Sequence, residues 1–362
     1  MSTAHVRVPI GPQHPLLKEP LCLVLDTEGE RVADVSLRIG YVHRGIERLC
    51  QERTYVQAVR VIERVCGICS HVHTTAFCHS VERLMGIEAP PRAVYLRVLL
   101  CELERMHSHL LWLGVLAEAI GFTTVFMYAW RDREILLDLM EGLSGGRVCH
   151  AVNQIGGVRI DVGPEQLAAV GQGLADFQEQ LDPFRSVLAR DHSFRMRTEG
   201  LGVLTLAQVR SLGVVGPTAR AAGSTLDLRR DAGYAAYPQL TFQVITGSGG
   251  DVWSRAQVRL LEVYESVSLC EQVLAQLPAG PVSVRAPRKA PPGEIVTRIE
   301  APRGELLYYV RSDGSNRPAR VKVRTPTMPS LRALQEQLPG LETADTAAVI
   351  AGADLCIACA DR

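Results

Sequence analysis

Two cysteine pairs of identical spacing lie near opposite ends of this 362-residue chain. Cys66 and Cys69 belong to the stretch ERVCGICSHVHTTAFCH, and Cys356 and Cys359 belong to DLCIACADR at the end of the sequence. One Cys-x-x-Cys pair is an ambiguous signal, but two pairs in one chain favour four thiolates that converge on a metal. The fold must then bring residues 356–359 next to residues 66–69.

The separation of the pairs bears on the kind of metal site. Thiolate sulfur is a soft donor that suits zinc, iron–sulfur clusters, copper(I) or nickel. Structural zinc sites usually bring their two pairs together over about 15–20 residues, so a separation of most of the chain favours a catalytic centre. The other cysteines are isolated, and we expect each to be a small buried hydrophobe: Cys22, Cys50, Cys78, Cys101, Cys149 and Cys270.

The composition is that of a folded protein with balanced charge. Hydrophobic residues make up 47% of the chain, which is ample for a core, and 39 Lys and Arg balance 39 Asp and Glu. Without a basic excess there is no reason to expect nucleic acid as a partner. The N-terminus lacks the apolar core of a secretory signal, and Glu118 interrupts the longest apolar run. We therefore expect a soluble, intracellular protein that could dock on a membrane partner.

Hydrophobic periodicity predicts a mainly α-helical fold with small β accessories around a bundle of long helices. A helix is expected over 93–119, with His107 and His109 as core or surface side chains rather than ligands. Further helices are expected over 44–61, from Gly163-Pro164-Glu165 and after the N-cap Asp251.

Two β hairpins are also predicted, with turns at 26–29 and 312–315. The whole chain, 1–362, is expected to form one domain. Its parts are an N-terminal β hairpin at about 20–40, a helical core at about 43–280, and a C-terminal β hairpin with a metal-binding tail at about 295–362.

Several stretches resemble the large subunit of nickel–iron hydrogenases. The likeness is greatest to the energy-converting, membrane-associated group, which is related to the quinone-site subunit of respiratory complex I. It rests on RVCGICSHVH and DLCIACADR, with GPQHPLLKEP, YVHRGIERL, NQIGGVRID and APRGE in the same order as in the family. The complex I relatives share GPQHP and RGIE-type stretches but lack the four thiols, so the cysteines argue for a hydrogenase.

The resemblance implies a nickel–iron centre whose iron carries CO and cyanide ligands, and no iron–sulfur cluster in this chain. Cys66 and Cys356 would be terminal ligands of nickel, and Cys69 and Cys359 would bridge nickel to iron. Thiolate sulfur can bridge two metals in this way.

The resemblance also implies roles for residues that stand at the same motif positions as functional residues of the family. Glu47, in RGIE, is expected to carry protons, because a carboxylate in a poorly hydrated pocket has a raised pKa. Cys356 would be the first proton acceptor. Arg303, in APRGE, would stand above the open metal position, polarise hydrogen and donate to cyanide. Pro302 would pack on the diatomic ligands.

Three more residues are expected around the centre. Pro326 and Thr327, in RTPTMP, resemble the stretch that supplies donors to the other cyanide, and Thr327 is also a candidate helix N-cap. His73 would hydrogen-bond a bridging sulfur, whereas a solvated loop position is expected for His71. Leu355 stands where the family usually has proline, which loosens the backbone there but removes no ligand.

The resemblance thus implies an enzyme that interconverts hydrogen with protons and electrons, coupled to ferredoxin-type carriers and membrane ion translocation. An iron–sulfur small subunit is implied, because this chain has no spare cysteine cluster for an electron relay. A ferredoxin-like subunit and membrane ion-translocating subunits would join it on the cytoplasmic face of the membrane, with this chain peripheral. Two alternatives remain: a complex I-like quinone-site subunit without a functional nickel–iron centre, and a scaffold protein with structural zinc.

Overall fold

The computed structural model of the chain describes residues 5–362. Its helices are α1 Ile46–Glu52, α2 Tyr55–Glu63, α3 Ser70–Met85, α4 Pro91–Ala119, α5 Thr123–Ser144, α6 Pro164–Arg190, α7 His192–Met196, α8 Leu206–Leu212, α9 Gly216–Ala221, α10 Leu228–Asp231, α11 Val252–Gln276, α12 Thr327–Gln337, α13 Thr346–Gly352 and α14 Ile357–Ala360, with 3-10 turns η1 Tyr237–Gln239 and η2 Thr343–Asp345. The strands are β1 His5–Ile10, β2 Cys22–Glu28, β3 Arg31–Arg38, β4 Asn153–Gln154, β5 Gly157–Val158, β6 Gly293–Ala301, β7 Gly304–Ser312 and β8 Arg320–Arg324.

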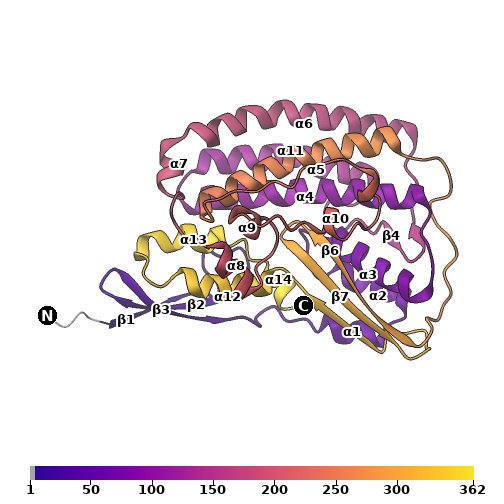
Figure 1. Cartoon of the computed structure of the whole chain (residues 1–362), viewed down its shortest axis with the longest axis horizontal. Helices are drawn as coiled ribbons and strands as arrows, with labels where there is room; N and C mark the ends of the chain where they lie inside the picture. The colour runs from indigo at the N-terminus through magenta and orange to yellow at the C-terminus, as the bar shows by residue number, and fades with distance from the viewer. Residues whose placement is uncertain (1–4) are drawn as a thin grey trace.

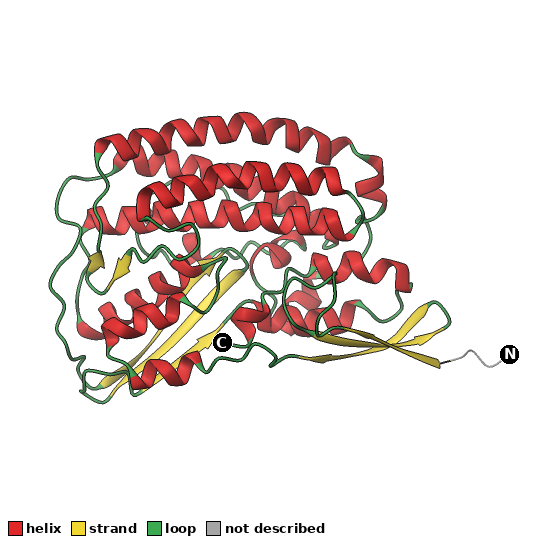
Figure 2. Cartoon of the chain, turned by 180° about the vertical axis from the view of Figure 1, so that it is seen from behind, coloured by secondary structure: helices red, strands yellow, loops and turns green. Residues whose placement is uncertain are grey.

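The long helices α4, α5, α6 and α11 form a layer on one side of the molecule (Figure 1). Two three-stranded antiparallel sheets, β1-β2-β3 and β6-β7-β8, lie on the other side with most of the shorter helices, as the view from behind also shows (Figure 2), whereas α7 stays beside the end of α6. The predicted class, mainly α with small β accessories, is confirmed. The assignment as one domain stays a prediction. Among residues 5–362 no helix is both long and apolar enough to cross a membrane.

The predicted long helices are present as α4, α6 and α11. The α4 helix begins with Pro91, a residue preorganised for the first helical position. The side chain of Asp251 caps α11 by accepting a hydrogen bond from Ser254 N at 2.7 Å, as predicted. The segment expected as one helix over 44–61 is two, because Thr54 and Gln57 form a capping box that starts α2 afresh. Sequence inspection missed α5.

Each three-stranded sheet has one strand more than the predicted hairpin, and the two-stranded β4-β5 sheet was not predicted. β1 and β6 were missed; β1 is exposed along most of its length and so shows no clear alternation. The first turn is at Gly29 and Glu30 rather than 26–29, because β2 runs through Glu28 and Gly29 supplies the positive φ of 62° that a tight turn needs. The second connection runs from Asp313 to Ala319 rather than over 312–315, because β7 includes Ser312 and β8 begins only at Arg320.

A layer of buried charges joins the helices to the β6-β7-β8 sheet. We call it the buried charge network; every side chain in it is at most 2% exposed, and its members are Glu102, Arg105, Arg220, Asp227, Arg229, Glu262 and Glu300. Arg220 binds Glu262 at 2.7 Å and Glu300 at 2.8 Å. Buried charges are tolerated only when they are paired, so this network ties α4, α9, α10 and α11 to β6 in one arrangement.

Candidate metal centre

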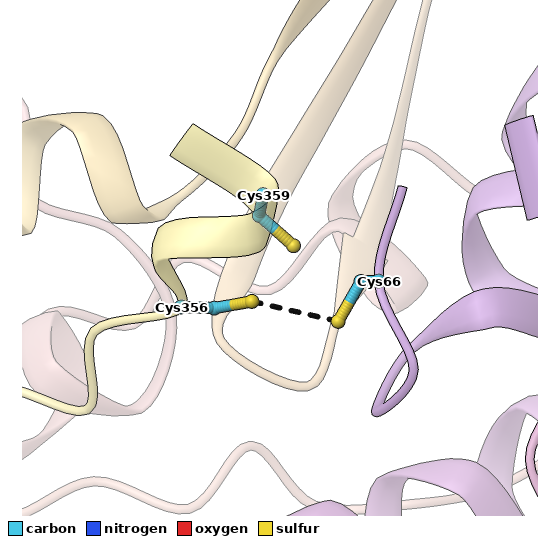
Figure 3. Close-up of side chains that lie close together, drawn as sticks. All are labelled: Cys66, Cys356 and Cys359. Carbon is cyan, nitrogen blue, oxygen red and sulfur yellow. Dashed lines mark hydrogen bonds between the residues drawn. The ribbon is translucent and has the colours of Figure 1, made fainter. Parts of the chain in front are cut away.

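The two cysteine pairs meet in the fold. Cys66 Sγ lies 3.5 Å from Cys356 Sγ, and Cys69 Sγ lies 3.8 Å from Cys359 Sγ. All four side chains are at most 4% exposed. The sulfurs of Cys66, Cys356 and Cys359 point toward one another (Figure 3) and lie within 4.8 Å of each other. The predicted convergence of the two pairs is therefore confirmed.

Helix α4 holds the first pair in place. The loop with Cys66 and Cys69 connects α2 to α3, and Glu104 of α4 accepts hydrogen bonds from His71 N at 2.7 Å and Val72 N at 2.9 Å, in the first turn of α3. Burial raises the pKa of Glu104 to about 8, although these backbone donors oppose the shift. Glu104 was not singled out in the sequence, where it is one of several charged residues on a long helix.

The imidazole of His107, on the same helix, lies 2.9 Å from the carbonyl oxygen of Ile68. Arg133 Nε donates to the other ring nitrogen of His107 at 3.2 Å, so the nitrogen that faces Ile68 carries the proton and donates it. His107 and His109 are buried core side chains, within the range expected for them. His107 thereby fixes the peptide between the first two cysteines.

The last residues of the chain carry the second pair and are anchored on both sides. Asp361 accepts from Gly40 N at 2.7 Å and from Val42 N at 3.2 Å, and Arg362 Nε lies 3.1 Å from the carboxylate of Glu47. Residues 361 and 362 are thus fixed to the connection between β3 and α1 and to α1 itself.

The raised pKa expected for Glu47 is wrong. Burial alone would raise it, but a hydrogen bond from Val323 N at 3.0 Å and the charges of Arg362 and Lys322 outweigh burial and leave the pKa below its ordinary value. Glu47 is a carboxylate that holds Arg362 and β8, and its surroundings favour the charged form.

Arg303 lies in the tight turn between β6 and β7, beside the buried Pro302. Its guanidinium contacts Asp354 at 2.9 Å and Ser108 Oγ at 3.3 Å. Burial would raise the pKa of Asp354, but Arg303, then Lys18 and other cations, lower it to about 2. Asp354 was missed in the sequence, although it stands two residues before Cys356. It holds the arginine beside the cysteines.

Close backbone contact fixes the position of this turn. A Cβ atom on Gly216, which has φ of 68°, would lie 2.4 Å from the carbonyl oxygen of Arg303 and 2.4 Å from Gly304 Cα. Only glycine permits both the left-handed backbone and this approach. The first residue of α9 therefore presses directly on the turn that carries Arg303.

His73 lies against the second pair. Its Nε2 is 3.5 Å from Cys359 Sγ, and its Nδ1 is 2.7 Å from the hydroxyl of Tyr308. Burial lowers the pKa of His73 to about 4, so the ring is neutral at pH 7. A sulfur that has lost its proton can only accept, and the arrangement that satisfies all three groups has Tyr308 donating to Nδ1 and Nε2 donating to sulfur.

His71 was expected in a solvated loop, and that expectation is wrong. α3 starts at Ser70, directly after Cys69, and its first turns are buried all round, so His71 is only 1% exposed. Its Nε2 lies 3.2 Å from the carbonyl oxygen of Arg97. His71 packs the helix and does not face the cysteines.

Pro326 and Thr327 lie where α12 begins. Thr327 is the first helical residue and Pro326 occupies the cap position, so the expectation that Thr327 caps this helix is wrong. Instead Thr327 Oγ1 accepts a hydrogen bond from Cys356 N at 3.3 Å. Because the hydroxyl oxygen of Thr327 accepts from Cys356 N, the hydroxyl proton of Thr327 is left to donate elsewhere.

A carboxylate that sequence inspection missed lies on the second pair. Glu19 accepts hydrogen bonds from Ile357 N and, at 3.1 Å, from Ala358 N, the two residues between Cys356 and Cys359. Burial, and then the charge of Cys356, raises the pKa of Glu19 to about 7. Glu19 also lines a cavity of about 30 Å³ with Lys18, whose apolar walls include Leu16, Leu355 and Ile357. That volume has room for one water molecule.

The donor set suits a soft transition metal. Sulfurs 3.5–3.8 Å apart are at the spacing expected when thiolates share metals at about 2.3 Å. A hydrogen bond from Cys359 acts to lower the pKa of Cys356. The contact with Cys66 and burial outweigh it and raise this pKa to about 12. Without a cation Cys356 therefore keeps its proton, which metal binding displaces, whereas hydrogen bonds with Cys359 and Cys66 lower the pKa of Cys69 to about 7. A nickel–iron group fits these residues, with the four cysteines as its ligands.

Two family models match the chain. One, described as the 49 Kd subunit of respiratory-chain NADH dehydrogenase, matches residues 119–292 and 284–362. The other, described as nickel-dependent hydrogenase, matches residues 44–181, which include the first cysteine pair. The two matches together cover most of the chain from residue 44 onward.

Similar proteins include subunits of hydrogenases, of an F(420)H(2) dehydrogenase and of NADH-quinone oxidoreductases. The chain is 39% identical to one subunit of the F(420)H(2) dehydrogenase of Methanosarcina mazei, over 98% of this chain and 97% of that protein. It is 38% identical to the carbon monoxide-induced hydrogenase of Rhodospirillum rubrum, over 98% and 99%, and 38% identical to the alpha subunit of the membrane-bound hydrogenase of Pyrococcus furiosus, over 99% and 87%. The chain therefore belongs to the oxidoreductase family that unites the large subunits of membrane-associated nickel–iron hydrogenases with the 49 kDa subunits of complex I.

Proposed function

We propose that this protein is the catalytic large subunit of an energy-converting nickel–iron hydrogenase. It interconverts hydrogen with protons and electrons, and the electrons pass to or from ferredoxin-type carriers in a complex that moves ions across a membrane. The observation that carries the proposal is the set of four buried sulfurs, which comes from two distant parts of the chain.

The surroundings of the sulfurs favour a reactive centre over structural zinc. A structural site needs four ligands and no reactive neighbours. Here the guanidinium of Arg303 contacts Asp354, two residues before Cys356, and the carboxyl of Glu19 accepts from the two residues between Cys356 and Cys359. These are groups that can stabilise charge and accept a proton.

Each residue around the four sulfurs would have a separate role in binding or surrounding a nickel–iron group. When bound, a nickel–iron group with CO and cyanide on iron supplies a soft, electron-rich pair of metals that splits hydrogen. Cys66, Cys69, Cys356 and Cys359 would hold this group through their sulfurs. Arg303, held by Asp354, places a positive charge next to the sulfurs, and Pro302 excludes water beside it.

The surrounding donors would then orient the group. His73 donates to the sulfur of Cys359 and stabilises its charged form. Thr327 accepts from Cys356 N with Pro326 beside it, and its hydroxyl proton would be available to a cyanide nitrogen. Cys356 would accept the first proton, and Glu19, hydrogen-bonded to the next two residues, would take it onward.

We assign the proton to Glu19 and not to Glu47, which faces Arg362 and Lys322. Replacing Glu19 with glutamine keeps the shape but removes the exchangeable carboxyl proton. We expect hydrogen–deuterium exchange catalysed by the purified complex to fall about 100-fold, a typical size for loss of a general acid or base, with nickel content unchanged. Gas-phase mass spectrometry of H2, HD and D2 measures the exchange.

Glu165→Gln, an exposed carboxylate on α6, is the matched control and should exchange at the normal rate. The assignment is contradicted when Glu19→Gln exchanges normally, or when Glu47→Gln loses exchange while keeping its nickel.

Elemental analysis with infrared spectroscopy of the purified complex tests the function itself. We expect about one nickel and one iron per copy of this chain, and absorption bands from intrinsic CO and cyanide. Zinc alone would support a structural site, and absence of metal would support a complex I-like quinone-site subunit. The match to the 49 kDa subunit favours the latter as the second candidate.

The partners follow from the proposal. Electrons need a route out, and the cysteines outside the two pairs are scattered, so an iron–sulfur small subunit would sit beside this chain, with a ferredoxin-like subunit and membrane ion-translocating subunits completing the complex. Gly67, between the first two cysteines, is exposed next to Val148, which is 49% exposed. This is where the small subunit would approach. The chain would be peripheral, on the cytoplasmic face.

A further inference from the structure

An arginine-lined cleft is formed in part by α2 and β4. These two elements lie near one end of the molecule (Figure 1). The volume of the cleft is about 450 Å³, and α2, the β4–β5 turn and the segment after α11 form its walls. We call it the arginine cleft. The residues that line it are Val56, Val59, Arg60, Asn153, Gln154, Ile155, Arg159, Ser283, Val284, Arg285, Ala286, Pro287 and Arg288.

The cleft concentrates positive charge in a chain whose net charge is zero. Four arginines line it and no carboxylate does. Among residues 5–362, no carboxylate lies within 4.0 Å of Arg159, Arg285 or Arg288, and Arg60 reaches only Glu63, at 3.5 Å. Like charges without counter-charges repel one another, so this cluster is stabilised when something anionic binds.

Backbone hydrogen bonds fix the residues that lead directly into Arg285. Val158 N donates to Val282 O and Val284 N donates to Gly156 O, each at 2.9 Å, so the segment after α11 pairs with the β4–β5 turn. The contact depends on glycine, because a Cβ on Gly157 would lie 2.2 Å from Val282 O. Side chains held on a fixed backbone lose less entropy on binding, so the cleft is preorganised.

The remaining walls indicate what kind of anion fits. Val56 is 71% exposed and Val284 is 40% exposed at the rim, and the amides of Asn153 and Gln154 add polar groups. A small inorganic anion would leave these valines uncovered in a cleft of this size. A peptide segment with carboxylates fits both the arginines and the exposed valines of the cleft. Guanidinium binds carboxylate in a two-point geometry, and apolar side chains of the peptide would cover the valines. Arginine is also enriched in protein interfaces.

We propose that the arginine cleft is a docking site for an acidic segment of a partner subunit, bound through Arg60, Arg159, Arg285 and Arg288. The cleft is linked to the first cysteine pair through the fold: α2 leads into the loop with Cys66, and Asn153 Nδ2 donates to His71 O at 3.2 Å. The docked segment therefore braces the elements that carry two of the four sulfurs. The proposal does not depend on which metal they hold.

Photo-crosslinking in the intact complex tests this docking site. Val56 is replaced by p-benzoylphenylalanine, the purified complex is irradiated, and crosslinked peptides are identified by mass spectrometry. We expect one predominant crosslink, to a segment of another subunit that has several Asp or Glu and a net negative charge. The double variant Arg285→Glu/Arg288→Glu should reduce its yield at least about 10-fold, the effect of about 1.4 kcal/mol.

The matched control is Arg190→Glu/Arg210→Glu, two exposed arginines outside the cleft, which should crosslink normally. A crosslink to lipid, to a neutral segment or only within this chain overturns the proposal, as does a yield that charge reversal leaves unchanged. Binding of inorganic phosphate without a crosslink to another subunit also overturns it. The same crosslink is expected in the Cys66→Ser variant, so this test and the metal analysis fail independently.

Discussion

The Cys66→Ser variant should purify without nickel and without hydrogenase activity. Cys66 is 3.5 Å from Cys356 in a site that is closed to solvent, so no other thiol can replace it. Loss of a group that only orients a ligand costs about 10–100-fold in metal affinity, and loss of a ligand should exceed that. We expect nickel by elemental analysis, and hydrogen uptake with a dye as electron acceptor, to fall at least about 100-fold.

Cys78→Ser makes the same chemical change at a buried thiol of α3 whose pKa burial raises to about 12. It should retain nickel and activity, which separates loss of a ligand from damage to the core. Full nickel and activity in Cys66→Ser would refute the assignment of the four cysteines as ligands. Loss of activity with nickel retained would limit Cys66 to a role other than metal binding.

The second large effect is on stability. Arg220→Met removes the cation that binds both Glu262 and Glu300 in the buried charge network. Two carboxylates are then left without this partner in a region closed to water. Breaking a buried ion pair by removing one partner costs about 3–5 kcal/mol, and we expect the free energy of unfolding to fall by that amount. Urea titration followed by tryptophan fluorescence measures the change.

Arg195→Met is the control, because Arg195 pairs with Glu199 at the surface, where both side chains are about half exposed. It should change the free energy of unfolding by less than about 1 kcal/mol. The double variant Arg220→Met/Glu300→Gln should recover part of the loss, since it removes one of the orphaned charges. Equal effects of Arg220→Met and Arg195→Met would show that the network does not stabilise the fold.

The sequence was sufficient for the thiols and for three of the four long helices, α4, α6 and α11. Thiol ligands are predictable because soft-metal chemistry demands cysteine and because their spacing is short and repeated. The periodicity that buries one face of α4 or α11 is also local to the chain. The same signal was present in α5, where Val125, Ala129, Leu136 and Met140 are buried at helical spacing.

The proton-carrying carboxylate could not be chosen from sequence, because a pKa depends on neighbours that only the fold supplies. Glu47 matched a family stretch, yet Val323, Lys322 and Arg362 arrive from more than 270 residues away and keep it charged. Glu19 has no periodic or capping signal of its own. Its raised pKa comes from burial against α14, which lies more than 300 residues further along the chain.

His71 was misjudged for a related reason. A stretch such as SHVHTT is polar enough to suggest a loop, and the burial of His71 follows from the helices and strands that enclose α3 on all sides. His73, by contrast, lies against the sulfur of Cys359 as expected. The role of Asp354 could not be predicted from the sequence. Its position before Cys356 is a local signal, but its function depends on Arg303, which is brought there by a glycine contact between α9 and the β6–β7 turn.

The anchoring of Asp361 and Arg362 to Gly40 and Glu47 has a consequence for how the protein is made. The ribosome adds Cys356 and Cys359 290 residues after their partners Cys66 and Cys69. Half of the ligand set is therefore missing while most of the polypeptide is synthesised. Under the proposed function, a metal could be held by all four sulfurs only after the second pair has been synthesised, and the contacts of residues 361 and 362 with Gly40 and Glu47 would then hold that pair in place.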